Sequence, residues 1–282
     1  MIKILVLGVN GMLGNTIFRH FSTNNQLEVI GVCRQAVPEL SSLSNNIKIV
    51  TNLIEYDSLI NIFSSFKPDV VINCVGIIKQ SDNSKHVLDS IPVNSLLPHR
   101  LSSLCRLLNA RLIHFSTDCV FSGNKGSYLE SDNPDPIDLY GRSKLIGEVM
   151  DQNTITLRTS IIGHELKSNK SFLNWFLSSH NEIKGYKNAF FSGLTTLEVA
   201  KVIEKYILPN PDISGLFHLA SDRISKYDLL SKISEVYNHK IKIIPENDYI
   251  IDRSLNCDKF IDKTGYSITP WSLQINEMYE FK

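Results

Sequence analysis

Two short motifs could carry out chemistry together. Tyr140 and Lys144 stand four residues apart, a spacing that places both side chains on one face of a helix. A phenol titrates at about pH 10, and a nearby ammonium stabilises its phenolate, so we expect Lys144 to lower the pKa of Tyr140 and make it an acid-base group. Near the N-terminus, Gly8, Gly11 and Gly14 have the spacing Gly-x-x-Gly-x-x-Gly, which would receive a dinucleotide pyrophosphate. The two motifs together indicate a redox enzyme.

The glycine motif stands where a strand should meet a helix. Residues 2–7 form an apolar run of strand length, and apolar residues recur at helical spacing from Met12 to Phe21. Backbone N–H groups at such a turn can bind phosphate, although the glycines could also serve only the close packing of helix on strand. The cofactor contacts predicted from this turn are Gly8, Asn10, Gly11, Met12, Leu13 and Gly14.

Strand-like and helix-like stretches alternate up to residue 160, which is typical of an α/β fold with a doubly wound parallel sheet, the Rossmann arrangement. Further strands are predicted over 27–32, 47–50, 70–75, 111–116 and 154–158, and helices over 57–66 and 96–108. The later pattern is less regular, with helices predicted over 172–179, 196–207 and 226–237 and a strand over 215–219. We expect residues 1–160 to form an NAD(P)-binding domain. Residues 161–282 should form mainly a smaller substrate-binding lobe, with some segments returning to the Rossmann sheet.

The composition excludes several classes of protein. The 29 basic and 29 acidic side chains cancel, and no long basic run is present, so no nucleic acid is expected as a partner. No segment reaches the roughly 18 apolar residues of a membrane span, and the N-terminal apolar run is too short for a signal peptide. The five cysteines are scattered without a Cys-x-x-Cys pair, which argues against disulfides and a metal site. We expect a cytoplasmic protein without a membrane partner.

The end of the second predicted strand bears on the choice of cofactor. Enzymes that select NAD usually place Asp or Glu there, whereas a 2′-phosphate favours a cation. This chain has Cys33-Arg34-Gln35, and the guanidinium of Arg34 could bind a 2′-phosphate with two hydrogen bonds. NADPH is therefore the predicted cofactor, with NADH as the alternative. Arg34 could also be a solvated loop residue.

Polar side chains gather at the end of the strand that precedes Tyr140. Ser116, Thr117 and Asp118 stand at the predicted carboxyl end of strand 111–116. Ligands of open α/β sheets bind at that edge, so we expect these side chains to lie close to Tyr140 and Lys144. This context turns a common helical spacing into a candidate active site.

The chain resembles the dTDP-4-dehydrorhamnose reductase family, which belongs to the extended short-chain dehydrogenases/reductases. Its two signature blocks are similar to residues 114–123, His-Phe-Ser-Thr-Asp-Cys-Val-Phe-Ser-Gly, and to residues 140–148, Tyr-Gly-Arg-Ser-Lys-Leu-Ile-Gly-Glu. Further similar blocks follow in order at 67–73, 93–98, 157–160, 215–220 and 253–255. The resemblance implies NAD(P)H-dependent reduction of the 4-keto group of a nucleotide-activated 6-deoxyhexose, in the supply of sugars for surface polysaccharide.

The resemblance also implies roles for individual residues. Thr117 takes the place of the catalytic Ser/Thr, Tyr140 that of the proton donor and Lys144 that of its activator, with both Tyr140 and Lys144 also contacting the cofactor. Further cofactor contacts are expected from Asn52, Leu53, Asn73, Cys74 and Gly76. Substrate contacts are expected from Ile77, Asp118 and Arg253, the last at the substrate diphosphate. Asn94 could brace the catalytic helix or cap the helix that follows it.

Four positions depart from the family pattern. Asn52 replaces an aspartate beside the adenine, Cys119 replaces a tyrosine, residues 77–80 replace a small loop that contains an aromatic residue, and residues 191–196 lack a Ser-Pro-Thr element. The last three concern the sugar more than the cofactor. They leave open a UDP-linked 2-acetamido-2,6-dideoxy-4-hexulose as the substrate in place of a dTDP-linked sugar.

Two other functions remain open. An epimerase or dehydratase that retains NAD would share the fold, but dehydratases commonly carry a glutamate where this chain has Cys119, and Arg34 argues against NAD. A non-catalytic, NADP-binding regulatory subunit could have lost Tyr140 or Lys144, yet this chain keeps both. The partner expected in each enzymatic case is a nucleotide sugar, with a homodimer as the candidate assembly.

Overall fold

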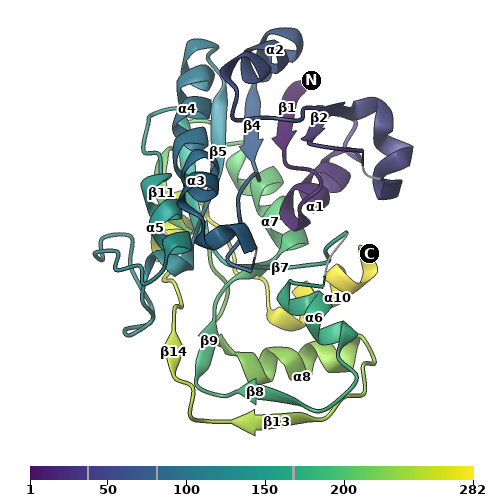
Figure 1. Cartoon of the computed structure of the whole chain (residues 1–282), viewed down its shortest axis with the longest axis vertical. Helices are drawn as coiled ribbons and strands as arrows, with labels where there is room; N and C mark the ends of the chain where they lie inside the picture. The colour runs from purple at the N-terminus through teal and green to yellow at the C-terminus, as the bar shows by residue number, and fades with distance from the viewer. Residues whose placement is uncertain (37, 81, 167–168) are drawn as a thin grey trace.

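A parallel sheet of seven strands forms the centre of the protein (Figure 1). The computed structural model describes residues 1–36, 38–80, 82–166 and 169–282. The strand order is β11-β6-β5-β4-β1-β2-β3. The strands are β1 (Ile2–Leu7), β2 (Leu27–Cys33), β3 (Ile47–Ile49), β4 (Val70–Asn73), β5 (Arg111–Thr117), β6 (Thr154–Thr159) and β11 (Gly215–His218). The order reverses beside β1, which is where doubly wound sheets bind dinucleotides.

Side chains of the central strands alternate between the two faces of the sheet. On β1, Ile4 and Val6 pack in a cluster with residues of α1 (Met12–Phe21) and α7 (Thr196–Val202). Leu5 and Leu7 pack on the opposite face with residues of α2 (Tyr56–Phe66) and α4 (Leu97–Leu107). Burial on both faces explains why these strands are continuous apolar runs and not alternating ones. The fold class predicted from the sequence is confirmed.

The C-terminal half builds a smaller lobe below the carboxyl ends of the central strands (Figure 1). Its core joins apolar residues of α6 (Phe172–Ser178), α8 (Lys226–Val236) and α10 (Trp271–Glu280). Short strands pair around these helices: β7 (Ile161–Ile162) with β10 (Leu194–Thr195), and β8 (Ile183–Tyr186) with β13 (Ile243–Glu246). A third small sheet has the order β12-β9-β14, formed by Ile224–Ser225, Ala189–Phe191 and Ile251–Asp252. The helix α9 (Asp258–Thr264) packs beside β11.

Most elements lie where the sequence predicted them, including β11, which pairs with β6 in the central sheet. The division of the chain at residue 160 stays a prediction. The predicted helix over 96–108 is longer at its N-terminal end than expected, since α3 (Val87–Ser90) and the π-helix η3 (Ile91–Leu96) lead into α4. Pro92 and Pro98 suggested in the sequence that no helix runs through this region. Each proline stands in the first turn of its helical segment, where proline is tolerated.

The described residues contain neither a membrane-spanning helix nor a metal-binding cluster. None of the helices there is both long and apolar enough to cross a membrane. The same parts of the chain hold no group of three or more His, Cys, Asp or Glu side chains arranged to bind a metal ion.

Candidate active site

In the glycine turn between β1 and α1, the backbone requires glycine at Gly8 and Gly14 but leaves room for a side chain at Gly11. Gly8 has a φ of +88°, and its N–H donates to the carbonyl oxygen of Val32 at 2.8 Å. A Cβ on Gly14 would lie only 2.3 Å from the carbonyl oxygen of Gly8, so this residue must be glycine for α1 to pack against the turn. A Cβ on Gly11 would meet that same oxygen at 3.4 Å, an ordinary contact, and Gly11 is exposed.

The N-terminus of α1 fits the phosphate groups of a dinucleotide. Within the described residues, the N-cap residue Gly11 gives the first turn of this helix no side-chain hydrogen bond. The free N–H groups and the positive end of the helix dipole favour an anion there. Asn10 and Met12, also predicted to contact the cofactor, are partly exposed beside the turn, whereas Leu13 is buried in the core.

The predicted adenosine side of the site lies at the ends of β2 and β3. Arg34 follows β2 directly and is exposed, so its guanidinium is free to reach a 2′-phosphate. Asn52 forms a local turn, in which its Oδ1 accepts from Ile54 N at 3.0 Å and its Nδ2 donates to Glu55 Oε1 at 3.0 Å. Leu53 is buried in the core beneath this turn.

The end of β4 forms the floor between the glycine turn and the catalytic strand. Asn73 is buried, accepts from Val75 N at 3.1 Å through Oδ1, and lies 3.2 Å from His114 Nδ1 through Nδ2. The backbone of Cys74 contacts Gly8 so closely that a Cβ on Gly8 would lie 3.1 Å from it. Burial raises the pKa of the Cys74 thiol, opposed by the charge of Lys144, so this cysteine stays protonated.

Thr117, Asp118 and Tyr140 meet at the carboxyl end of β5. The Thr117 hydroxyl donates to Asp118 Oδ1 and accepts from Cys119 N, both at 3.1 Å. The side chain of Tyr140, in α5 (Leu139–Ile146), lies near the Thr117 hydroxyl. Burial is the main effect on the phenol and raises the pKa of Tyr140, although the nearby Thr117 hydroxyl acts to lower it. The prediction that this pKa is lowered is wrong for this structure, because burial disfavours the phenolate and the nearby carboxylates of Asp118 and Asp138 also raise the pKa.

Lys144 lies one helical turn after Tyr140 and is buried. Its Nζ donates to the carbonyl oxygen of Phe115 at 2.6 Å. Burial lowers the pKa of Lys144 to about 8, while the charge of Glu148 acts to raise it. The ammonium is thus held against the strand that carries Thr117, with a proton that it can lose near neutral pH.

The loop after β4, which departs from the family pattern, is tied to α5 at two points. Asn94, in η3, accepts from Ile77 N at 2.8 Å and donates to Ile77 O and to Ser143 Oγ, each at 3.1 Å. Lys79 pairs with Asp138, the N-cap of α5, at 2.8 Å. Asn94 therefore braces the catalytic helix and does not cap α4, which has no side-chain cap. Gly76 lies between these contacts and Asn73, with Asn94 Oδ1 close to it.

A buried ion pair beneath the catalytic residues was missed by the sequence analysis. Glu148 accepts from Arg158 Nε at 2.7 Å and from Nη2 at 2.8 Å, and it accepts from Ser116 Oγ at 2.6 Å. Through Ser116, Glu148 is bonded to the residue next to Thr117, and its charge raises the pKa of Lys144. This carboxylate therefore interacts with both the catalytic strand and the catalytic helix. Its position four residues after Lys144, in helical spacing, was the available signal.

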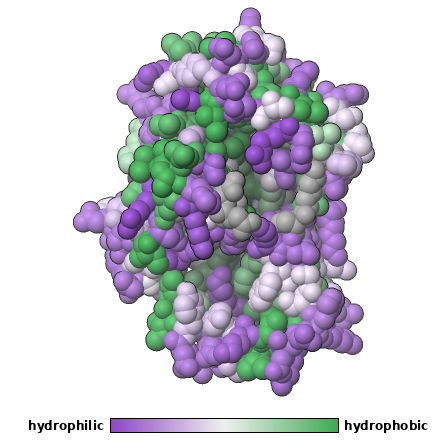
Figure 2. All heavy atoms as spheres, in the orientation of Figure 1, coloured by the Kyte–Doolittle hydropathy of each residue, from purple (hydrophilic) through white to green (hydrophobic). Residues whose placement is uncertain are grey.

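Two cations of the C-terminal half face Asp118. Arg253 follows β14 and donates through Nε to Phe121 O at 2.8 Å. Lys226 begins α8 and was not predicted as a site residue. Burial raises the pKa of Asp118, and the charges of Arg253 and Lys226 both act to lower it. All the predicted catalytic and substrate residues therefore lie around one end of the sheet, beside the region where the surface is hollowed above the smaller lobe (Figure 2).

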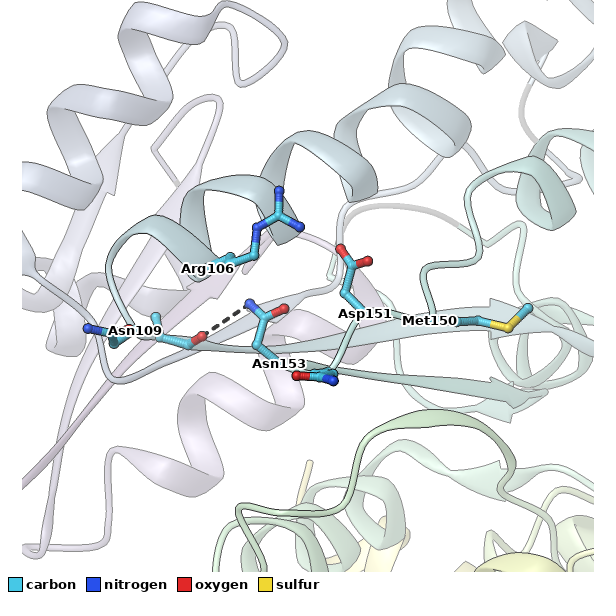
Figure 3. A pocket seen from close by; sticks show the side chains of 7 residues that line it. Arg106, Asn109, Met150, Asp151 and Asn153 are labelled. Carbon is cyan, nitrogen blue, oxygen red and sulfur yellow. Dashed lines mark hydrogen bonds between the residues drawn. The ribbon is translucent and has the colours of Figure 1, made fainter.

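A separate pocket lies at the opposite end of the sheet (Figure 3). Its volume is about 580 Å³, and it is lined where α4 ends and β6 begins by Arg106, Asn109, Ala110, Met150, Asp151, Gln152 and Asn153. Asn153 Nδ2 donates to Ala110 O at 3.3 Å across it. Because ligands of open α/β sheets bind at the carboxyl ends of the strands, we exclude this pocket from the candidate active site.

Comparison with known proteins identifies the family. The family model described as RmlD substrate binding domain matches residues 2–281. Methionine adenosyltransferase 2 subunit beta of Bos taurus is 25% identical over 250 residues, which cover 84% of this chain and 72% of that protein. The dTDP-4-dehydrorhamnose reductase of Aggregatibacter actinomycetemcomitans is 28% identical over 241 residues, with 81% and 76% covered.

The fold is shared with solved structures of the same family. The crystal structure of dTDP-4-dehydrorhamnose reductase from Bacillus anthracis, in complex with NADP, has a TM-score of 0.81 to this chain at 19% identity and covers 100% of this chain and 99% of its own. Since the family model spans almost the whole sequence, the chain belongs to the RmlD family, the dTDP-4-dehydrorhamnose reductase family that its motifs predicted.

Proposed function

We propose that this chain is an NADPH-dependent oxidoreductase that reduces the 4-keto group of a nucleotide-activated 6-deoxyhexose, in the supply of sugars for surface polysaccharide. The observation that carries the proposal is the close approach of the Thr117 and Tyr140 side chains, with Lys144 buried on the same helix as Tyr140. The reductases among its relatives support the same enzyme class. In this proposal residues 1–160 bind the cofactor and residues 161–282 supply most of the substrate lobe.

The raised pKa of Tyr140 supports the reductive direction. A phenol that stays protonated can donate its proton to the C4 oxygen of the sugar as negative charge develops there. The Thr117 hydroxyl, beside it, would turn its single proton from Asp118 to donate a hydrogen bond to the same oxygen. The Lys144 ammonium stabilises the phenolate that remains, until a proton from solvent restores the phenol.

The cofactor assignment rests on the glycine turn and on Arg34. When bound, the reduced nicotinamide would supply the hydride that attacks C4. The open N-terminus of α1 suits its pyrophosphate, and the exposed guanidinium of Arg34 suits a 2′-phosphate. The NADP bound to the Bacillus anthracis reductase agrees with this choice.

A second function is favoured by one specific observation. The similarity to methionine adenosyltransferase 2 subunit beta extends over 84% of the chain, and that relative is named as a subunit of another enzyme. A regulatory role would not require the Thr117, Tyr140 and Lys144 arrangement, which is complete here. We therefore rank it below the reductase.

The test is a turnover assay. Purified protein is mixed with NADPH and a panel of dTDP- and UDP-linked 4-keto-6-deoxy sugars, 2-acetamido forms included, and the loss of NADPH absorbance is followed. Oxidation of one NADPH per sugar reduced is the expected result. A changed sugar without net oxidation would indicate an epimerase or dehydratase, and inertness across the panel would favour the regulatory function.

A further inference from the structure

Lys226 is placed unusually for a lysine. It is the first residue of α8, where the positive end of the helix dipole disfavours a cation. Its ammonium lies 4.6 Å from the ring centroid of Phe172 and 5.5 Å from that of Phe191, and the side chain is partly buried there. Among the described residues, no carboxylate lies within ion-pair distance of Lys226 and no acceptor hydrogen-bonds it.

The guanidinium of Arg253 lies near Lys226. Its Nε donates to Phe121 O at 2.8 Å, while its two terminal nitrogens have no hydrogen-bond partner in the part of the chain that the structure describes. The charges of Lys226 and Arg253 act on each other and on Asp118, so the three groups share one corner of the site.

The carboxylates near the two cations already have other partners. Asp118, on which both cations act, accepts a hydrogen bond from Thr117 through Oδ1. Arg253 also acts on Asp135 and Asp138, but Asp135 accepts from Ser122 N at 2.8 Å and Asp138 pairs with Lys79 at 2.8 Å. Burial lowers the pKa of Lys226, which shows that its ammonium is disfavoured without an anion nearby. A sugar hydroxyl carries no charge and would not correct this, whereas a diphosphate carries about two negative charges and offers several acceptor oxygens.

We infer that Lys226 acts with Arg253 to bind the diphosphate of the substrate, and that Lys226 makes the site specific for nucleoside diphosphate sugars over monophosphate sugars. This inference rests on the proposed function for the presence of a nucleotide sugar. Arg253 supplies a planar fork that matches paired phosphate oxygens, and Lys226 supplies a point charge from the opposite element. The aromatic rings of Phe172 and Phe191 hold the ammonium of Lys226 in place by cation–π contact.

The test measures binding without turnover. Calorimetry on the purified full chain gives the dissociation constants of UDP, dTDP, UMP and dTMP for wild type and Lys226→Met, which keeps an unbranched stem between the rings. We compare whichever of UDP and dTDP binds more tightly with the monophosphate of the same nucleoside. The wild type should bind the diphosphate at least tenfold more tightly than that monophosphate, and Lys226→Met should remove most of this difference in affinity. The matched control is Lys187→Met, which also removes a lysine over an aromatic ring, at 5.4 Å from Tyr227, and should leave it unchanged.

Two results would overturn the inference. One is a folded Lys226→Met variant that discriminates between diphosphate and monophosphate as well as wild type, and the other is a wild type that binds neither diphosphate. The proposed function fails separately, since a protein with the expected Lys226-dependent binding could still reduce no 4-keto sugar. Conversely, a reductase whose folded Lys226→Met variant gives the first of these results would keep the proposed function, although the inference would be wrong.

Discussion

The ammonium of Lys144 lies 2.6 Å from the backbone carbonyl oxygen of Phe115, and this bond joins the catalytic helix to the catalytic strand. Phe115 stands two residues before Thr117 on β5, so a shift of the helix would move Tyr140 away from the Thr117 hydroxyl. Because the bond is charge-assisted and buried, it holds the two elements more firmly than a neutral contact would.

Tyr140→Phe should retain NADPH binding and lose nearly all turnover. The substitution removes only the hydroxyl, and general acid catalysis of this kind contributes about 10²- to 10⁴-fold. The measurement pairs kcat with a fluorescence titration of NADPH, and Tyr249→Phe, at an exposed tyrosine of the lobe, is the control. A Tyr140→Phe enzyme within a few-fold of wild type would disprove the mechanism.

The pH profile of reduction should follow Lys144. Its pKa is lowered to about 8, so the ammonium is present below that pH and is lost as the pH rises through it. With the Tyr140 pKa raised, the phenol remains protonated over the same range. We expect kcat to fall above about pH 8, approaching tenfold for each pH unit. A profile that stays flat well beyond this point would show that the Lys144 charge is not required.

Glu148→Gln should both shift that profile and weaken the fold. Glu148 raises the pKa of Lys144, so its loss should move the fall in kcat to lower pH. It also leaves Arg158 buried without its carboxylate, which costs about 3–5 kcal/mol in the free energy of unfolding. Adding Arg158→Met should recover much of that stability in urea unfolding without restoring the pH profile. Recovery of both would assign Glu148 a purely structural role.

Arg34→Ala should weaken NADPH binding and spare NADH. A hydrogen bond to a charged group is worth about 1.5–3 kcal/mol, which corresponds to roughly 10- to 150-fold in kcat/KM with NADPH. The ratio of kcat/KM for the two cofactors is the readout. Arg106→Ala, in the pocket at the other end of the sheet (Figure 3), should leave the ratio unchanged. An equal loss with both cofactors would contradict the 2′-phosphate contact.

Alanine at Gly11 and at Gly14 should have different effects. At Gly14 the new Cβ would lie 2.3 Å from the Gly8 carbonyl oxygen, and such overpacking costs about 1–3 kcal/mol of stability. At Gly11 the protein has room for a Cβ, so the free energy of unfolding of Gly11→Ala should stay within about 1 kcal/mol of wild type. This variant should nevertheless bind NADPH more weakly. Urea unfolding and a fluorescence titration of NADPH separate the two effects. Unchanged NADPH affinity in Gly11→Ala would place the pyrophosphate elsewhere.

The elements of the first half were predictable because their signals are local. Each parallel strand is buried on both faces, so it appears as a short apolar run, and each helix repeats its apolar residues every three or four positions. The short strands of the lobe, such as β7 and β10, were not predicted. Two-residue strands carry no periodicity, and their pairing depends on segments that meet only after folding.

The sequence by itself determined the glycine turn, the Tyr140 and Lys144 spacing and the family, since each depends on residue types at short fixed separations. Only the tertiary structure decided the direction of the Tyr140 pKa, the bracing of α5 by Asn94 and the approach of Lys226 to Asp118. Burial sets a pKa through desolvation, and burial is a property of the whole packed molecule. Lys226 and Asp118 are 108 positions apart in the chain, and only the packing of the lobe against the sheet brings them to one site.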